Sequence, residues 1–372
     1  MARGHATGAR DRMNAAGPGE RSRSGVIRVL VVDDSALVRR ILTEALDRHP
    51  DIEVVGTATD PYVARERIVA LRPDVVTLDV EMPRMDGLSF LAKLMRHFPL
   101  PVVVVSSVTP QNSDAALRAL ALGAVDVIAK PGAMQATAEV TDELVRAVRT
   151  AARARVSRLV EAVVDLPGRA PAIASLDSTH KVIAIGASTG GTQAIEAVLR
   201  RFPVDAPATV IVQHMPEHFT LSFAKRLDSI CAMSVREARD GDVLAPGLAL
   251  VAPGGKHLVI QASGARWVAR VKDGPKVHHQ RPAVDVTFQS LARCAGRNVV
   301  AALLTGMGAD GAKGMLALRD AGAHTIAQDE ATSVVWGMPR EAIKLDAATE
   351  VLPLHDVAHG LLHALGREAA LV

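Results

Sequence analysis

The chain contains little of what several classes of protein depend on. Only two of its 372 residues are cysteines, Cys231 and Cys294, which have neither the number for a disulfide framework nor the spacing of a metal site. Its nine aromatic residues (six Phe, two Trp, one Tyr) are too few for a surface that stacks single-stranded bases. The longest apolar runs, such as Val299–Leu304, fall far short of the roughly 20 residues that span a bilayer. These absences argue against a disulfide-rich, a single-strand-binding and an integral membrane protein.

The net charge of +3 at pH 7 has a local origin. Five arginines against two acidic residues within residues 1–25 account for all of it, so residues 26–372 are neutral in sum. We interpret residues 1–25 as a disordered tail. Because this segment lacks the continuous apolar core of a secretory signal, we expect a cytoplasmic protein. Since the rest of the chain is neutral in sum and shows no basic recognition helix, we expect neither nucleic-acid binding nor direct membrane insertion.

From Val26 onward, short β-branched runs alternate with amphipathic helical stretches, a pattern typical of parallel α/β folding. Five strand–helix units fit into residues 26–149. A stretch with prolines, glycine, serine and threonine follows within residues 150–180, which we assign as a linker. The alternation resumes over residues 181–368 and is interrupted at residues 234–272 by Asp-Gly, Pro-Gly and Gly-Gly pairs, which predict a small β excursion. The sequence therefore predicts two α/β domains joined by a linker.

Five polar residues of the first domain each follow a predicted strand: Asp33, Asp34, Asp79, Ser106 and Lys130. The carboxyl ends of strands in an open parallel sheet meet at one crevice, so we expect these side chains to converge. Three carboxylates this close repel one another unless a divalent cation lies among them, and a set of oxygen ligands suits Mg²⁺. Asp79 is then the expected nucleophile toward a phosphoryl group, with Ser106 and Lys130 contacting its oxygens. Asp33 and Asp34 alone would more simply be helix caps, but the complete set in this order favours a phosphorylation site.

These residues lie in four motifs: VLVVDDS (29–35), LDVEMPRMDG (78–87), VVVVSS (102–107) and GAVDVIAKP (123–131). On these motifs the first domain resembles the response-regulator receiver domain. The resemblance implies a flavodoxin-like (βα)5 fold, Mg²⁺ held by the three aspartates, and transfer of phosphate from a histidine kinase to Asp79. It also implies that Ser106 and Lys130 sense the phosphoryl group. Val127 departs from the family, because many receivers have there an aromatic residue whose rotation reports phosphorylation. The sequence thus leaves open how the signal leaves this pocket.

In the second domain a glycine-rich turn, GASTGG (186–191), follows a strand and precedes a helix. From the residues alone it has three interpretations: a phosphate-cradling turn, a G-x-S-x-G nucleophile elbow, or a tight turn that needs small residues. A dinucleotide site would require G-x-G-x-x-G and an acidic residue at the end of the next strand, and both are missing. That strand ends instead in His214, which would lie beside Ser188 if the two strands are neighbours.

A catalytic triad also needs a group that orients the imidazole, and Asp310 in a later glycine-rich turn can supply it. Each residue has a simpler interpretation, a structural histidine for His214 and a helix cap for Asp310. Spacing does not exclude His257 or His278 as the base. The order Ser188, His214, Asp310 differs from the Ser, Asp, His order of α/β-hydrolases, so the elbow would be convergent.

Seven motifs of the second domain occur together: IGASTGGT (185–192), VQHMP (212–216), DGDVLAPG (240–247), APGGKHL (252–258), RPAVDVTF (281–288), LLTGMGADGAKGM (303–315) and QDEATSVVWGMP (328–339). On these motifs the domain resembles the catalytic domain of the chemotaxis protein-glutamate methylesterase (CheB) family. The resemblance implies a doubly wound parallel sheet with Ser188 as nucleophile, His214 as general base and Asp310 as the acid that orients it. The backbone N–H groups of Thr189 and Met307 are the expected oxyanion donors.

With a receiver in front, the resemblance implies a phosphorylation-activated hydrolase for chemotactic adaptation. Its expected substrates are γ-glutamyl methyl esters of methyl-accepting chemoreceptors, which yield glutamate and methanol, and the same machinery would release ammonia from receptor glutamines. The expected partners are these receptors and a chemotaxis histidine kinase. Ester hydrolysis itself is expected to need no cofactor.

Two other classes of protein fit parts of the pattern. One is a phosphorylation-controlled binding module with an inactive hydrolase-like domain, but retention of all three triad residues argues against it. The other is a DNA-binding response regulator, which would carry a short helix-turn-helix output instead of the long α/β alternation found here. Methanol release from methylated receptor and a mobility-shift assay with DNA separate the three classes.

Overall fold

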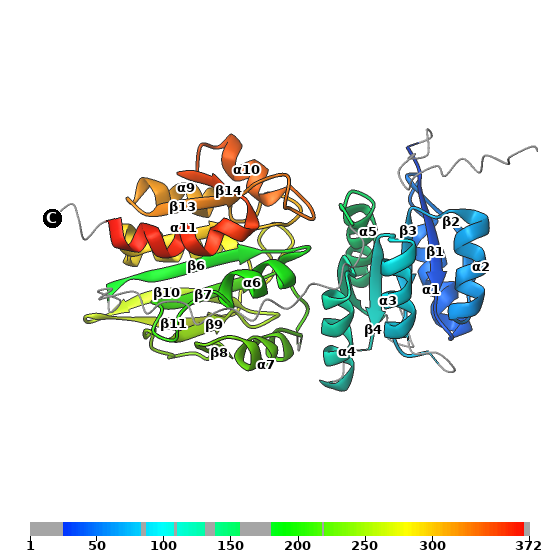
Figure 1. Cartoon of the computed structure of the whole chain (residues 1–372), viewed down its shortest axis with the longest axis horizontal. Coiled ribbons are helices and arrows are strands. Elements are labelled where there is room, and N and C mark those ends of the chain that lie inside the picture. The colour runs from blue at the N-terminus through cyan, green and yellow to red at the C-terminus, as the bar shows by residue number, and fades with distance from the viewer. Residues whose placement is uncertain are drawn as a thin grey trace, which may run out of the picture.

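The computed structural model describes residues 25–82, 87–107, 110–130, 138–156, 180–217 and 219–367. It contains two large parallel sheets, each in an α/β domain, which lie side by side along the long axis of the molecule (Figure 1). The predicted tail up to residue 24 and the greater part of the predicted linker (157–179) lie outside the described residues, so these assignments stay predictions. Within the described ranges, no helix has the length and apolar character needed to cross a membrane.

The first domain is a five-stranded parallel sheet in the order β2-β1-β3-β4-β5. This order is that of the flavodoxin-like fold, so the predicted fold of this domain is confirmed. Its elements are β1 (Ile27–Val32), α1 (Ala36–Leu46), β2 (Ile52–Ala58), α2 (Pro61–Leu71), β3 (Val75–Leu78), α3 (Gly87–His97), β4 (Val102–Ser106), α4 (Pro110–Ala121), β5 (Asp126–Ala129) and α5 (Ala138–Ala151).

Helices cover both faces of this sheet, and the strand sequences reflect it. β4 has the sequence VVVVS with every residue buried, which is why it is a continuous apolar run without alternation. α1 begins at Ser35, whose hydroxyl accepts a hydrogen bond from the N–H of Val38. α2 begins in the same way at Asp60, whose carboxylate accepts hydrogen bonds from the N–H groups of Tyr62 and Val63. These caps start the helices directly after the strands, at the edge of the sheet where the polar residues gather.

The second domain is a seven-stranded parallel sheet in the order β14-β13-β12-β6-β7-β9-β8, with a separate antiparallel hairpin of β10 and β11. The predicted doubly wound α/β class is confirmed. Its elements are β6 (Val182–Ala187), α6 (Gly191–Leu199), β7 (Ala208–Gln213), α7 (Phe219–Ile230), β8 (Ser234–Glu237), β9 (Leu248–Val251), β10 (His257–Ser263), β11 (Arg266–Lys272), α8 (Val284–Cys294), the 3-10 helix η2 (Gly296–Asn298), β12 (Val299–Leu303), α9 (Ala312–Asp320), β13 (His324–Gln328), α10 (Met338–Lys344), β14 (Glu350–Leu352) and α11 (Leu354–Arg367).

Alternate residues of the central strand β6 enter two different hydrophobic cores. Ile183 and Ile185 pack in one core with residues of α6, α7 and α11. Val182 and Ala184 pack in the other with residues of α8, α9 and α10. The strand order changes direction at β6, and the carboxyl ends of strands beside such a point form the usual ligand crevice of open α/β sheets.

The expected β excursion is smaller than the sequence indicates. β8 and β9 join the edge of the main sheet in parallel, and β10 and β11 alone form the separate hairpin. The Gly- and Asp-rich turns of this segment mark where strands end, but they carry no signal for the sheet that each strand joins.

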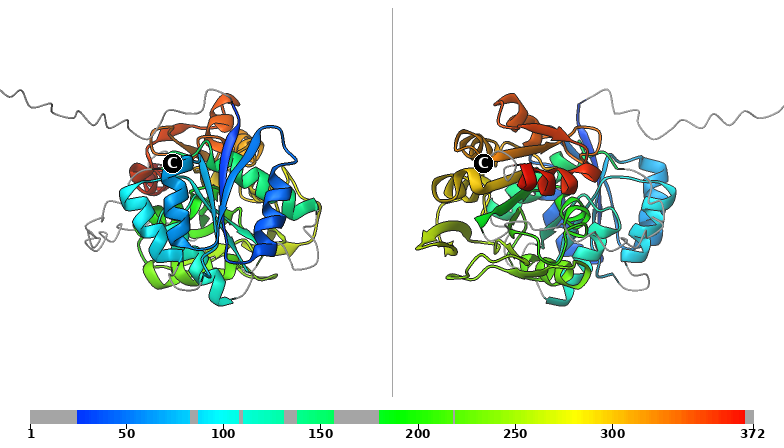
Figure 2. Two further views of the ribbon diagram at one scale, coloured as in Figure 1. Left: turned by 90° about the vertical axis from the view of Figure 1, so that its right-hand side faces the viewer. Right: turned by 60° about the vertical axis from the view of Figure 1, so that its left-hand side comes forward.

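The two domains are in direct contact, and Figure 2 views them from the side of the first domain and from the other side. α4 packs against α6 and α7, and the side-chain amide of Gln193 donates to the carbonyl of Leu120. After α5 the chain reaches the second domain, where the N–H of Arg155 donates to the carbonyl of Val334 (2.9 Å). The Arg155 guanidinium also pairs with Glu330 at 2.7 Å. The arrowhead of β6 points toward the first domain, so the carboxyl edge of the second sheet faces it (Figure 1).

Candidate active site

The carboxyl ends of the first sheet carry an acidic pocket. Asp33 follows β1 and Asp79 follows β3, and both are buried, with 0% and 1% of their surface exposed. Lys130 follows β5, and its Nζ lies 2.7 Å from Oδ2 of Asp79 and 3.3 Å from Oδ2 of Asp33. Carboxylate oxygens of Asp33, Asp34 and Asp79 lie within 4.8 Å of one another, and the buried Ser106 ends β4 at the same edge. The structure thus gathers all five predicted residues at one edge of the sheet.

Negative charge is concentrated in this pocket. Burial raises the pKa of Asp33 above its ordinary value and the charge of Asp79 adds to the rise, although Lys130 acts in the opposite direction. Burial acts to lower the pKa of Lys130, but its contacts with Asp79 and Asp33 outweigh burial and raise it. Oδ2 of Asp33 is buried, and among the described residues it has the ammonium of Lys130 as an ion-pair partner at 3.3 Å but no well-formed hydrogen bond. A buried carboxylate oxygen with so little hydrogen bonding, beside two more carboxylates, fits the oxygen coordination of Mg²⁺.

Ser188 lies in a turn that small residues alone can form. It follows β6, its N–H donates to the carbonyl of Thr305 (3.0 Å), and its own carbonyl accepts from the N–H of Gly191 (2.7 Å). A Cβ atom on Gly191 would lie 2.1 Å from Oε1 of Gln213. Gly190 has a φ of 76°, in the left-handed region that favours glycine. The two glycines let α6 begin directly behind the serine, which remains half-buried at the edge of the sheet.

His214 follows β7, the strand paired with β6. Its N–H donates to the carbonyl of Ala187, the residue before Ser188, at 3.1 Å. Its side chain is 4% exposed, and Nε2 lies 2.7 Å from Oδ2 of Asp310. Because an ionised carboxylate only accepts hydrogen bonds, Nε2 carries the hydrogen in this contact. Nδ1 is buried without a hydrogen-bond partner among the described residues, so it is the ring nitrogen available to accept a proton.

Asp310 is 2% exposed and is held by the N-terminus of α8. The N–H of Val284 donates to its Oδ2 (2.7 Å) and the N–H of Asp285 to its Oδ1 (2.9 Å), in addition to His214. Burial acts to raise the pKa of Asp310, but the hydrogen bond and charge of His214 and the two N–H groups outweigh it and lower the pKa. A helix N-terminus also favours an anion. Asp310 therefore does not cap the helix that follows it, α9, whose N-cap is Gly311.

Thr189 and Met307, the expected oxyanion donors, flank Ser188 from two sides. Thr189 follows it directly and is 5% exposed. Met307 lies in the turn after β12, where a Cβ atom on Gly306 would lie 2.7 Å from Cβ of Ser188. Because residue 306 is glycine, this turn can approach the serine closely. The placement is consistent with the two donors, whose role stays a prediction.

Comparison with known proteins identifies the family. Residues 183–361 match the family model of the CheB methylesterase, and residues 29–142 match that of the response regulator receiver domain. A protein-glutamate methylesterase/protein-glutamine glutaminase of Syntrophus aciditrophicus is 54% identical over 333 residues, 89% of this chain and 97% of the relative. This chain belongs to the CheB methylesterase family.

Other members of the family show the same extent of similarity. A relative of the same name from Pseudomonas aeruginosa is 54% identical over 346 residues, 92% of this chain and 98% of the relative. Among solved structures, the Thermotoga maritima CheB methylesterase catalytic domain is 37% identical and covers 50% of this chain and 98% of that chain, with a TM-score of 0.49. The two family models and the two relatives confirm the resemblance drawn from the motifs, while the roles of the individual site residues stay predictions.

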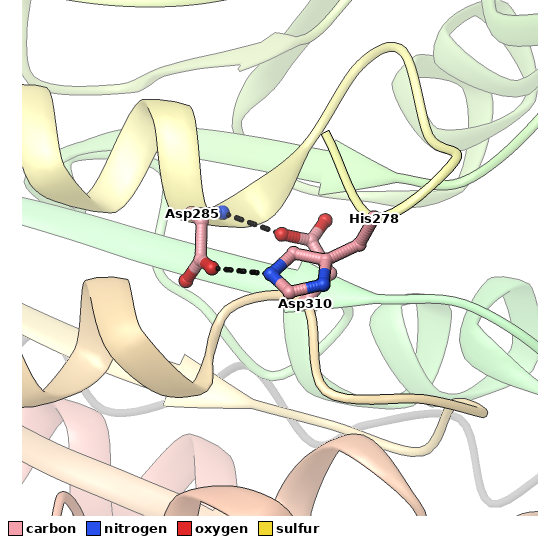
Figure 3. A group of neighbouring side chains, drawn as sticks. All are labelled: His278, Asp285 and Asp310. Carbon is pink, nitrogen blue, oxygen red and sulfur yellow. Dashed lines mark hydrogen bonds and ion pairs between the residues drawn. The ribbon is translucent and has the colours of Figure 1, made fainter. Parts of the chain in front are cut away.

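The sequence left His257 and His278 open as alternatives to His214. His257 is 4% exposed, and its two ring nitrogens lie 2.9 and 3.3 Å from backbone atoms with which they form hydrogen bonds. Nε2 of His278 lies 3.1 Å from Oδ2 of Asp285 (Figure 3). Among the histidines that the structure describes, His214 is the one hydrogen-bonded to Asp310. The geometry therefore favours His214 as the base.

Two residues that support the sites were not predicted. The amide of Gln213 donates to the carbonyl oxygens of Ser188 (2.9 Å) and His214 (3.0 Å), which ties the two turns together. The guanidinium of Arg39 donates to the carbonyl oxygens of Asp33 (2.7 Å) and Asp34 (2.9 Å). Gln213 lies within the motif VQHMP, directly before the histidine, but the motif gave it no role, and no pattern in the sequence pointed to the arginine.

Proposed function

We propose that this chain is a phosphorylation-activated hydrolase that removes methyl groups from γ-glutamyl methyl esters of chemoreceptors in the cytoplasm. The observation that carries the proposal is the contact between Nε2 of His214 and Asp310, which leaves Nδ1 unpartnered at the strand end beside Ser188. The relatives are named protein-glutamate methylesterase/protein-glutamine glutaminase.

The first half of the reaction forms an acyl-enzyme. Oγ of Ser188 attacks the ester carbonyl carbon while Nδ1 of His214 takes the serine proton. Asp310 keeps the Nε2–H of the ring in place and stabilises the imidazolium that forms. The N–H groups of Thr189 and Met307 receive the oxyanion, and one such donor is worth about 10²–10³ in rate. As the bond to the methoxy oxygen breaks, His214 returns the proton, and methanol leaves.

The second half consumes water by the same route. His214 takes a proton from water, the water oxygen bonds to the acyl carbon, and Ser188 leaves with the returned proton. Ester and water thus yield glutamate and methanol. A glutamine side chain differs in its leaving group alone, so the same residues would release ammonia from it.

The first domain would control this activity. Asp79 accepts phosphate from a chemotaxis histidine kinase, and Asp33, Asp34 and Asp79 are the residues that would hold Mg²⁺. The metal would neutralise the pocket and the oxygens of the incoming phosphoryl group. Lys130 and Ser106 would contact those oxygens once the phosphoryl group is on Asp79, and the ammonium of Lys130 already lies 2.7 Å from that carboxylate.

The contact between the domains supports control by a steric block. Thr150, near the end of α5, contacts the side chain of Met307, beside the catalytic serine. A cleft of about 490 Å³ lies here, lined by Met307, Arg153 and Arg340 among others. The receiver would therefore stand where a receptor helix must enter, and phosphorylation would open the entrance by shifting the population of receiver conformations.

The test is incubation of the purified chain with receptor that carries labelled methyl esters, with Mg²⁺, in the presence and absence of a small-molecule phosphodonor. We expect labelled methanol, released faster with the phosphodonor. Absence of methanol under both conditions would overturn the proposal and favour a binding module. A shift of DNA mobility at the same salt concentration would favour a DNA-binding regulator.

A further inference from the structure

A second buried carboxylate lies beside the catalytic acid. Asp285 is in the first turn of α8 and is 3% exposed. Its Oδ1 accepts a hydrogen bond from the N–H of Gly314 in α9 at 2.6 Å, and its own N–H donates to Oδ1 of Asp310 at 2.9 Å. One residue thus connects α9 to α8 and α8 to the catalytic acid. The mechanism above uses its N–H but not its charge.

The partner of Asp285 is a histidine in a strained turn. Nε2 of His278 lies 3.1 Å from Oδ2 of Asp285 (Figure 3), and 36% of the histidine side chain is exposed. Val277 and Gln280 exchange backbone hydrogen bonds (3.0 and 2.9 Å), and the two residues between them, His278 and His279, have φ values of 51° and 63°. Two-residue turns with both φ values positive prefer Asn and Gly. Here the turn accepts two histidines in the left-handed region and holds the first against the buried carboxylate.

The side chains of His278, Asp285 and Asp310 place oxygen and nitrogen atoms within 4.8 Å of one another. Each of the four carboxylate oxygens already accepts a hydrogen bond: those of Asp310 from His214, Val284 and Asp285, and those of Asp285 from Gly314 and His278. We therefore interpret the cluster as a hydrogen-bonded network rather than a cation site.

The charge of Asp285 is costly where it lies. Burial raises the pKa of Asp285 above its ordinary value, and the charge of Asp310 raises it further, whereas the N–H of Gly314 and the nearby His278 lower it. His278, with Nε2 3.1 Å from Oδ2 of Asp285, offsets the second negative charge beside Asp310 whenever its ring is protonated. Without it, that charge would add to the field of Asp310 at the ring of His214.

Resting on the proposed hydrolase function, we propose that Asp285 and His278 are positioning residues for the catalytic acid. Asp285 fixes the N-terminus of α8, whose two N–H groups hold Asp310. His278 balances the charge of Asp285, so that the field at His214 comes mainly from the catalytic acid. Both residues act through Asp310 and not on the substrate.

The other ionisable side chains near the N-terminus of α8 either form hydrogen bonds to backbone atoms or are exposed. His257 on β10 uses both ring nitrogens in hydrogen bonds to the backbone. Arg281 in the same loop donates to a backbone carbonyl at 2.7 Å. Lys276 in the loop and Lys313 on α9 are exposed, as is His279, whose side chain makes no hydrogen bond or ion pair with the described residues. His279 is therefore a matched control for its neighbour.

The test compares His278→Gln, Asp285→Asn and the control His279→Gln in the phosphorylated full-length protein, by the pH dependence of kcat/KM for methanol release. In His278→Gln the uncompensated Asp285 favours the protonated form of His214, so the acid limb moves to higher pH by about 0.5–1 unit. In Asp285→Asn the extra negative charge is gone, so the limb moves to lower pH by about the same amount. His279→Gln leaves the limb where it is in the wild type.

Opposite displacements distinguish positioning from a general loosening of the fold, which would lower the rate at all pH values alike. If the two variants leave the limb within about 0.2 pH unit of the wild type, or move it in one direction, the inference is wrong. If Asp285→Asn loses its folded circular dichroism spectrum, the displacement in His278→Gln decides alone. It must then be upward and absent from His279→Gln.

A second measurement separates this inference from the proposed function. NMR titration of the His214 ring in histidine-labelled protein needs no substrate, and its midpoint should move in the same two opposite directions. Such shifts in a protein that releases no methanol would refute the hydrolase function and keep the charge coupling. Normal methanol release without these shifts would keep the hydrolase function and refute the charge coupling.

Discussion

Replacement of Asp310 by asparagine tests the triad at its most constrained group. Oδ2 of Asp310 accepts from His214 and Val284, and Oδ1 accepts from Asp285. Asparagine offers one acceptor oxygen and one donating NH₂. At one of the two oxygen positions of Asp310 the NH₂ must therefore face a group that is itself a hydrogen-bond donor. With the NH₂ at Oδ1, one N–H loses its acceptor. With the NH₂ at Oδ2, the N–H of Val284 loses its acceptor and His214 must also change tautomer, so we expect the first orientation.

The expected loss follows from this orientation. The Nε2–H of His214 keeps an acceptor, but a neutral one, while the imidazolium still forms in the transition state. A hydrogen bond to a charged group is worth about 1.5–3 kcal/mol, so kcat should fall by roughly 10- to 10²-fold. The orphaned N–H of Asp285 should lower the free energy of unfolding by about 1–3 kcal/mol. A change of tautomer would cost far more, about 10⁴-fold in the serine-protease type case.

Single-turnover release of methanol gives the rate, ¹⁵N NMR of labelled histidine gives the tautomer, and thermal denaturation gives the stability. A loss of less than about threefold would show that Asp310 is only a cap of α8 and that another acid orients the base. A loss near 10⁴-fold with the hydrogen on Nδ1 would show that the amide takes the other orientation, against the hydrogen-bond argument above.

Four further predictions can be checked with the same preparations. Ser188→Ala should abolish methanol release while the melting temperature stays near that of the wild type, and residual activity above a few per cent would remove the serine from the mechanism. Asp79→Asn should lose Mg²⁺-dependent, hydroxylamine-labile phosphorylation; labelling at the wild-type level would move the site, with Asp34 the first alternative. A fragment that starts near Ser175 should outperform the unphosphorylated full-length protein on receptor and ignore the phosphodonor, whereas equal rates would exclude a steric block. Gly191→Ala should destabilise the second domain by about 1–3 kcal/mol, because its Cβ would overlap a neighbouring side chain; an unchanged denaturation midpoint would show that the turn has room.

Strand ends made much of the fold and of both sites predictable. Buried parallel strands are short Val- and Ile-rich runs with an abrupt polar end, so the sequence shows where each one stops. The ends of neighbouring parallel strands meet, which placed Asp79 with Lys130 and Ser188 with His214 before any contact was known.

What the sequence could not show depends on contacts between distant segments. β8 and β9 lie in a turn-rich stretch that resembles a hairpin excursion, and the pairing of β9 with β7 and of β8 with β9 is set by packing of the whole sheet. Three histidines fitted the spacing for a base, and the choice follows from loop conformations that place each ring against a different partner. Which ring nitrogen of His214 faces Asp310, and which backbone groups Asp285 contacts, likewise depend on the three-dimensional structure.

The contact of Thr150 with Met307 has a consequence beyond access to the serine. If the receiver domain only blocked the entrance to the site, a small ester would still reach Ser188 and react at the full rate. Thr150 also touches the side chain of Met307, whose backbone N–H is an expected oxyanion donor, so we expect a movement of α5 to shift that donor for every substrate. Hydrolysis of a small activated ester such as p-nitrophenyl acetate should then also accelerate on phosphorylation. The ratio of that acceleration to the one on receptor would measure how much of the control acts on bond breaking rather than on entry.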